Sequence, residues 1–131
     1  MINFFAIIVS TIIYFILGAL WYSNYLFGKA WVKANKFDMN ELSMGPKELI
    51  GAAGSAFVSV LFFAILLELI APFDFVTALL VSFIIGGGFI FTTGLYDVLY
   101  EDKNVVAYLI DASYHFVAIL IAGLILGLWQ I

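Results

Sequence analysis

Residues 2–22 read INFFAIIVSTIIYFILGALWY and contain no charged side chain. The hydrocarbon core of a bilayer is about 30 Å thick, and a helix rising about 1.5 Å per residue needs about 20 apolar residues to cross it. The stretch therefore predicts a transmembrane helix. The whole chain has the same character, because 66% of its 131 residues are hydrophobic and 11% are charged. An average soluble domain is about 25% charged, so the composition excludes a soluble globular protein as well as a disordered chain.

Three further apolar runs follow, and each is long enough to span a membrane. Asp74 and Asn104 precede the third and fourth runs and are good N-cap residues. Only a few residues separate the second and third runs, so these two helices are expected to be antiparallel neighbours. The sequence predicts an all-α integral membrane protein, a four-helix bundle forming one membrane domain over residues 1–131. The expected spans are 2–22, 49–71, 75–96 and 105–129.

The lysines predict the orientation in the membrane. All five of them fall in the connections between the first and second spans and between the third and fourth spans. Because loops rich in lysine stay on the cytoplasmic side, we expect a multi-pass protein of the cell membrane with lysine-rich loops in the cytoplasm and both termini outside. The five residues are Lys29, Lys33, Lys36, Lys47 and Lys103.

The first connection contains an amphipathic segment over residues 26–38. Lys29, Lys33 and Lys36 share one helical face, and Trp31 belongs to the opposite, apolar face. This pattern favours a helix that lies in the membrane interface, with its lysines toward lipid headgroups and Trp31 as an anchor. Membrane lipids are therefore expected partners. A cytoplasmic extension of the first span is the alternative.

Small residues recur at every fourth position in three of the spans. Such spacing lets helix backbones approach closely, either inside the bundle or between subunits. Four short helices bury little surface from lipid, so we expect a homo-oligomer, with a dimer favoured. The stripes are Gly51, Ser55 and Ser59; Ala78, Ser82 and Gly86; Ala118 and Ala122; and Gly123 and Gly127.

Gly86, Gly87 and Gly88 form a run of three glycines in the middle of the third span. Each glycine weakens a helix by up to about 1 kcal/mol. One interpretation is tight packing against a neighbouring helix. The other is a hinge that lines a cavity, because irregular backbone at this depth is tolerated only there.

The last span carries an acid and a histidine four residues apart, Asp111 and His115, on one helical face. Ionisable groups inside a membrane are costly and are candidates for function by default. They are typical of a proton-handling pair, whereas a histidine that only hydrogen-bonds a neighbouring helix is the structural alternative. The complete polar site candidate consists of His115, Asp111, Asp97, Tyr22, Tyr96 and Tyr114.

Other kinds of chemistry find no support. The chain has no cysteine, no arginine and one histidine, so disulfides are excluded, and neither a metal site nor a cofactor is expected. No basic stripe favours nucleic acid. No nucleophile elbow, phosphate loop or metal motif is present, so no catalytic residue is predicted.

Several short motifs together resemble a family of small four-helix membrane proteins, the domain of unknown function 1761. The resemblance covers nearly the whole chain and implies this fold and topology, but no activity. Its most specific part is Gly18-Ala19-Leu20-Trp21-Tyr22. The other parts are Phe27-Gly28-Lys29-Ala30-Trp31; Thr92-Thr93 with Leu95, Asp97, Leu99 and Glu101; Tyr114-His115; and Gly127-Leu128-Trp129.

These residues leave three functional hypotheses. The first is a small transporter or channel-like protein for protons, cations or a small solute, with His115, Asp111, Asp97 and Tyr22 along its polar path. The second is a membrane scaffold, or a protein that binds a partner or lipid, in which His115 joins two helices. The third is a membrane-embedded enzyme acting on a lipid or a quinone.

Overall fold

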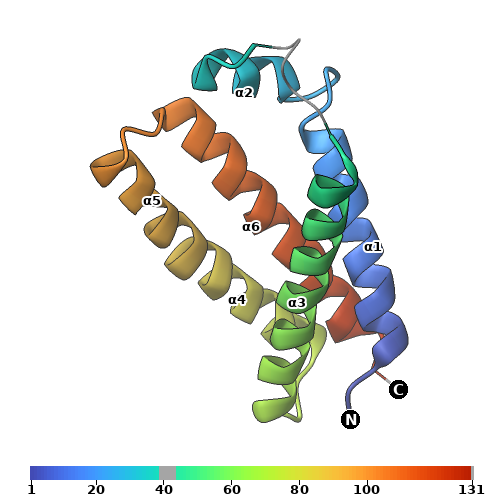
Figure 1. The fold of residues 1–131 in the computed structure, drawn as a ribbon. Coiled ribbons are helices and arrows are strands. Elements are labelled where there is room, and N and C mark those ends of the chain that lie inside the picture. Colours follow the sequence, from blue (N-terminus) through green and yellow to red (C-terminus); the bar gives the residue numbers. More distant parts are fainter. Residues whose placement is uncertain (39–43, 131) are drawn as a thin grey trace.

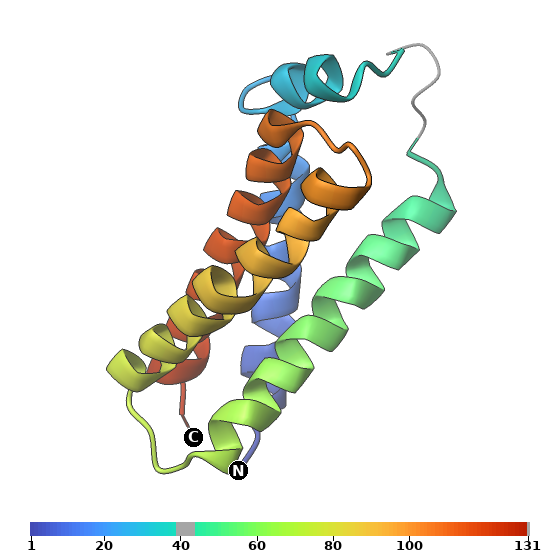
Figure 2. The same cartoon turned by 90° about the vertical axis from the view of Figure 1, so that its left-hand side faces the viewer.

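The computed structural model describes residues 1–38 and 44–130, and all regular structure in these ranges is helical (Figures 1 and 2). Four helices are long and apolar enough to cross a membrane, and a short helix lies between the first and the second. The predicted all-α membrane fold is confirmed. The elements are α1 (Phe4–Trp21), α2 (Gly28–Asn35), α3 (Pro46–Leu69), α4 (Phe75–Phe83), η1 (Ile84–Ile90), α5 (Phe91–Tyr100) and α6 (Val105–Leu128).

The helix starts follow local sequence signals. The Asp74 carboxylate accepts a hydrogen bond from the backbone N–H of Thr77 at 2.8 Å, which caps α4. The side chain of Asn104 caps α6 in the same way. These side chains satisfy N–H groups that have no partner inside the helix. At α3, Pro46 occupies the first turn and Glu48 accepts a hydrogen bond from the backbone of Gly45.

The two ends of the bundle carry different elements. Both termini lie at one end, called here the termini end, and α2 lies across the opposite end together with the loop 101–104 (Figure 1). We call that opposite end the lysine end. Lys29, Lys33 and Lys36 are exposed there.

Helix α2 is shorter than the predicted segment 26–38. It ends at Asn35, because Lys36 adopts a left-handed conformation with φ 56°. Gly28 starts it at a point where the chain doubles back, and a Cβ at this position would overlap the carbonyl oxygen of Tyr22. Only glycine leaves enough room for this turn.

Helices α4 and α6 pack closely through the small residues that the sequence singled out, and we call this contact the seam. A Cβ on Gly127 would lie 2.6 Å from the Cα of Phe75, and one on Gly123 would overlap the Ser82 hydroxyl. Ala78 and Ser82 are fully buried. Small residues therefore bring these two backbones together, as the spacing predicts.

Helix α3 packs mainly on α1 and is separated from α4 and α5 over much of its length (Figure 2). Ile7 and Val60 are fully buried where α1 and α3 contribute to the core. The first half of α3 is largely exposed, and nothing lies within 4 Å of a Cβ built on Gly51. Within the described chain, the stripe formed by Gly51, Ser55 and Ser59 is therefore not a helix contact.

The third membrane helix is continuous from Phe75 to Tyr100, but its middle, η1, is a π-helix. Gly86 is buried there, and a Cβ on it would overlap the ring of Phe116 on α6. Gly87 and Gly88 meet no such neighbour. Tight packing thus accounts for one of the three glycines, and the hinge stays a prediction for the other two.

Candidate functional site

A cavity of about 1050 Å³ lies between α3 on one side and η1, α5 and α6 on the other. Its polar walls face the lysine end, where Tyr22, Asp97, Lys103 and Asp111 line it. His115 lines it one helical turn deeper than Asp111. The cavity therefore gathers side chains from α1, α5 and α6, together with the loop before α6, at one end of the bundle.

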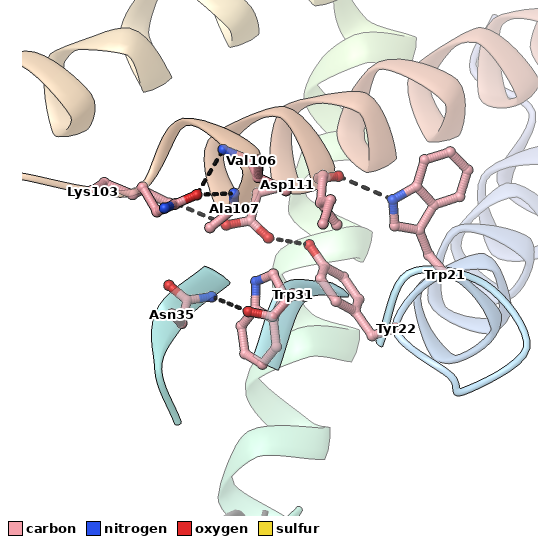
Figure 3. A network of polar contacts seen from close by, with 10 residues as sticks. Trp21, Tyr22, Trp31, Asn35, Lys103, Val106, Ala107 and Asp111 are labelled. Carbon is pink, nitrogen blue, oxygen red and sulfur yellow. Dashed lines mark hydrogen bonds and ion pairs between the residues drawn. The ribbon is translucent and has the colours of Figure 1, made fainter. Parts of the chain in front are cut away.

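Asp111 is held by two partners from different parts of the chain. Its carboxylate accepts a hydrogen bond from the Tyr22 hydroxyl at 2.5 Å and pairs with the Lys103 ammonium at 2.7 Å (Figure 3). Both charged side chains are about one quarter exposed. The Trp21 indole N–H donates to the backbone carbonyl of Ile110 at 3.0 Å. These contacts fix the end of α1 against the first turns of α6.

His115 has a separate partner on α1. Its Nδ1 lies 2.6 Å from the Tyr14 hydroxyl, a hydrogen bond between the two helices. The His115 side chain is exposed on the cavity side rather than enclosed in the core. Its Nε2 makes no hydrogen bond within residues 1–38 and 44–130, so it is available to a molecule in the cavity.

Asp111 and His115, the predicted proton-handling pair, do not hydrogen-bond to each other. Asp111 contacts Tyr22 and Lys103, whereas His115 contacts Tyr14. Both side chains nevertheless line the same cavity. A molecule in the cavity could therefore contact both Asp111 and His115, which do not contact each other through a hydrogen bond.

Asp97 enters the site from α5. It is half-buried and lines the cavity. In the part of the chain that the structure describes, its carboxylate makes no hydrogen bond or ion pair. Only its backbone carbonyl is engaged, by the N–H groups of Glu101 and Lys103. Among the described residues, Asp97 is therefore the acid of the site whose charge has no partner.

Two of the tyrosine candidates lie outside the cavity wall. Tyr96 is 61% exposed and stacks on Tyr100 at the outer side of α5. Tyr114 packs edge-on against Tyr14, and its hydroxyl donates to the Tyr14 carbonyl at 2.9 Å. A Cβ on Gly18 would lie 2.7 Å from that hydroxyl. Tyr114 thus joins α1 to α6, and Gly18 makes room for it.

Two residues that bond the ionisable groups of the site were not among the predicted candidates. Tyr14 holds His115, and Lys103 neutralises Asp111. A signal for the first was present, because Tyr14, Gly18 and Tyr22 follow one another at spacings of four and share one helical face. No comparable pattern in the sequence predicts that Lys103 lines the cavity, since a lysine in a loop is normally solvated.

The predicted membrane-interface residues divide into two groups. Lys29 and Lys33 of α2 and Lys36 just after it are exposed, but Trp31 is half-buried and packs on Tyr22 at 5.4 Å between ring centres. Its indole N–H is buried and has no hydrogen-bond partner in the described residues. Trp31 thus contacts the protein beside Asp111 (Figure 3), which places α2 over the polar end of the cavity.

The family model described as protein of unknown function (DUF1761) matches residues 5–127. The chain belongs to this family. The match covers every residue of the cavity. No curated protein and no solved structure matches the chain. The description of DUF1761 states no activity, so the role of this protein with four membrane-length helices has to be argued from the site itself.

The charge balance of this DUF1761 site favours a positive ligand. Among the residues that the structure describes, two carboxylates, Asp97 and Asp111, line the cavity with a single ammonium, that of Lys103. One negative charge is therefore in excess. A half-buried charge loses hydration and gains from a counter-ion, because attraction is stronger where the dielectric constant is low. The site is suited to a proton or a cation and repels anions.

Proposed function

We propose that the protein is a small transporter for protons, cations or a small positively charged solute. The observation that supports this is the cavity in which Asp97, Asp111 and His115 meet at one end of a membrane bundle. Intramembrane acids and histidines mark proton and ion pathways in pumps and transporters. Asp97 would receive the positive charge, and His115 Nε2 would accept or donate a proton beside it.

A carrier fits the walls of the cavity better than an open channel does. Beyond His115, toward the termini end, the lining is apolar and includes Leu66, Leu69 and Ile119. A continuous polar path is therefore absent from the described arrangement, and a charged solute needs a helix movement to reach the far side. The unpacked glycines Gly87 and Gly88 are where we expect that movement, as in transporters with interrupted helices.

The orientation also belongs to this proposal. With the lysine end in the cytoplasm and both termini outside, the polar mouth of the cavity opens on the cytoplasmic side. The exposed lysines of α2 would then meet anionic headgroups of the inner leaflet. A homo-oligomer, with a dimer favoured, stays a prediction.

A flux assay tests the proposal. Purified protein is reconstituted into liposomes, and proton and cation movement is followed under an imposed gradient. We expect flux with the wild type and at least a tenfold loss with Asp97→Asn, because the amide keeps the shape of the side chain and removes its charge. Glu101→Gln, which removes an acid outside the cavity, is the matched control and should retain flux. Absence of flux with the wild type under every gradient would refute transport.

A scaffold role is the second candidate, and a specific set of contacts favours it. The hydrogen bonds of His115, Tyr114 and Trp21 all join α1 to α6. Polar side chains serve as interhelical links in membranes. If this is their whole role, His115→Ala lowers the thermal midpoint in detergent while neither wild type nor variant supports flux. An unchanged midpoint would contradict the scaffold hypothesis.

A further inference from the structure

Away from the lysine end, the walls of the cavity are apolar. Phe62 and Leu66 of α3 face it from one side, and Ile85 and Ile90 of η1 face it from the other. An inorganic cation gains nothing from such walls. Hydrocarbon groups do, because apolar surface is stabilised when it is removed from water and packed against apolar side chains. The lining therefore matches a ligand with a substantial apolar body.

The cavity is also partly open between α3 and α5, where its lining residues Phe62 of α3 and Thr93 of α5 are exposed. Helix α3 stands apart from α5 at the lysine end (Figure 2), and Phe62 at the edge of the cavity is 66% exposed. In a bilayer this opening faces lipid, since α3 and α5 are parts of membrane-length helices. A ligand dissolved in the membrane can reach the cavity without passing through water.

The polar end specifies the charge of the ligand. Asp111 is neutralised by Lys103 at 2.7 Å, whereas Asp97 has no partner within residues 1–38 and 44–130. The carboxylate of Asp97 is half-buried and lines the cavity. Because no described side chain supplies the positive charge that Asp97 lacks, this carboxylate favours a ligand that is positively charged.

Aromatic rings complete the polar end. Tyr14, Tyr22 and Tyr108 all line the cavity. The face of an aromatic ring attracts cations, most strongly those with a weak hydration shell, such as substituted ammonium ions. Small hydrated ions profit less, because they would first have to lose their water. The rings therefore favour an organic cation.

We infer that the cavity binds amphiphilic organic cations, that is, hydrophobic amines or quaternary onium ions, which enter from the bilayer between α3 and α5. The charge lies at Asp97 among the tyrosines, and the apolar body lies against Phe62 and Leu66. This inference rests on the proposed function, because it names the substrate class of the same site.

Two ions of the same shape and opposite charge test the inference. The full chain is placed in nanodiscs of zwitterionic lipid, and binding of tetraphenylphosphonium and tetraphenylborate is measured without a gradient. We expect saturable binding of the phosphonium, with at least tenfold weaker affinity for the borate. Equal binding of both ions, or no saturable binding of the phosphonium, would overturn the inference, because charge would not be recognised.

Variants locate the two parts of the ligand. Asp97→Asn is expected to weaken phosphonium binding at least tenfold, and Glu101→Gln is expected to leave it unchanged. If Asp97→Asn does not fold, Phe62→Ala replaces it, because Phe62 lies on an exposed face and its truncation should weaken binding several-fold in a folded protein. Unchanged affinity in Phe62→Ala and in every folded Asp97 variant would place the ion elsewhere and overturn the inference.

The binding result is independent of the flux result. Phosphonium binding without flux of any ion would sustain the ligand class and refute transport. Proton or inorganic cation flux without phosphonium binding would sustain transport and refute the ligand class.

Discussion

The seam between α4 and α6 and the opening between α3 and α5 are built from similar sequences but differ in packing. In the seam, a Cβ on Gly127 would lie 2.6 Å from the backbone of Phe75. On α3, a Cβ on Gly51 would meet nothing within 4 Å. Both glycines belong to stripes of small residues at spacings of four. The same pattern thus brings two helices together in one place and leaves a helix apart in the other.

The difference has a physical cause that is specific to membranes. Lipid tails are as apolar as leucine, so no hydrophobic force closes a gap between two apolar helices. Helices pack where backbones interlock and hydrogen bonds link them, as at α4–α6 and α1–α6. Elsewhere an apolar face remains exposed to lipid without penalty. An opening such as that beside α3 is therefore tolerated.

The largest effect should come from adding one methyl group to the seam. Gly127→Ala forces the backbones of α4 and α6 apart, and overpacking of this kind costs about 1–3 kcal/mol. Gly51→Ala is the matched control, because its methyl group meets open space and alanine favours a helix by up to about 1 kcal/mol. The free energy of unfolding is measured by titration with sodium dodecyl sulfate, followed by tryptophan fluorescence. Similar losses in both variants would contradict the contrast between seam and opening.

A smaller effect is expected where α1 meets α6 beside the cavity. Tyr14→Phe removes the hydroxyl that bonds His115, and a typical hydrogen bond contributes about 1 kcal/mol to stability. Tyr96→Phe is the control, since Tyr96 is exposed and its hydroxyl makes no hydrogen bond in the described residues. The same titration measures both variants. If Tyr14→Phe is as stable as Tyr96→Phe, the Tyr14–His115 contact does not hold the cavity wall.

The smallest effect concerns the cap at the start of the seam. The backbone N–H of Thr77 lowers the pKa of the Asp74 carboxyl below its ordinary value of 3.8. The charged cap therefore adds stability above the unfolded pKa, and this contribution is lost as the pH falls through the folded pKa. Thermal midpoints between pH 7 and pH 3 should fall less in Asp74→Asn, because asparagine still caps but does not titrate in this range. Parallel curves would show that the cap carries no pH-dependent stability.

The sequence was sufficient for the fold because hydropathy and caps are local signals. Asp74 and Asn104 predicted two helix starts, and four apolar runs predicted four membrane helices. The candidate site was only partly predictable. Asp111 and His115 were chosen because charge in a membrane is rare, and they do share a cavity with Asp97. Their partners Tyr14 and Lys103 depend on how helices rotate against each other, which no local pattern records.

The π-helical turn of η1 has a consequence for the rotational phase of the third membrane helix. In an α-helix of about 3.6 residues per turn, the face that Ala78, Ser82 and Gly86 turn toward α6 would return at Asp97. A π turn holds about one residue more, which delays the phase by about 100°. Gly94 then faces α6, where the Tyr108 ring lies 3.1 Å from the position of its Cβ. The wide turn thus rotates Asp97 away from the contact with α6 and toward the cavity.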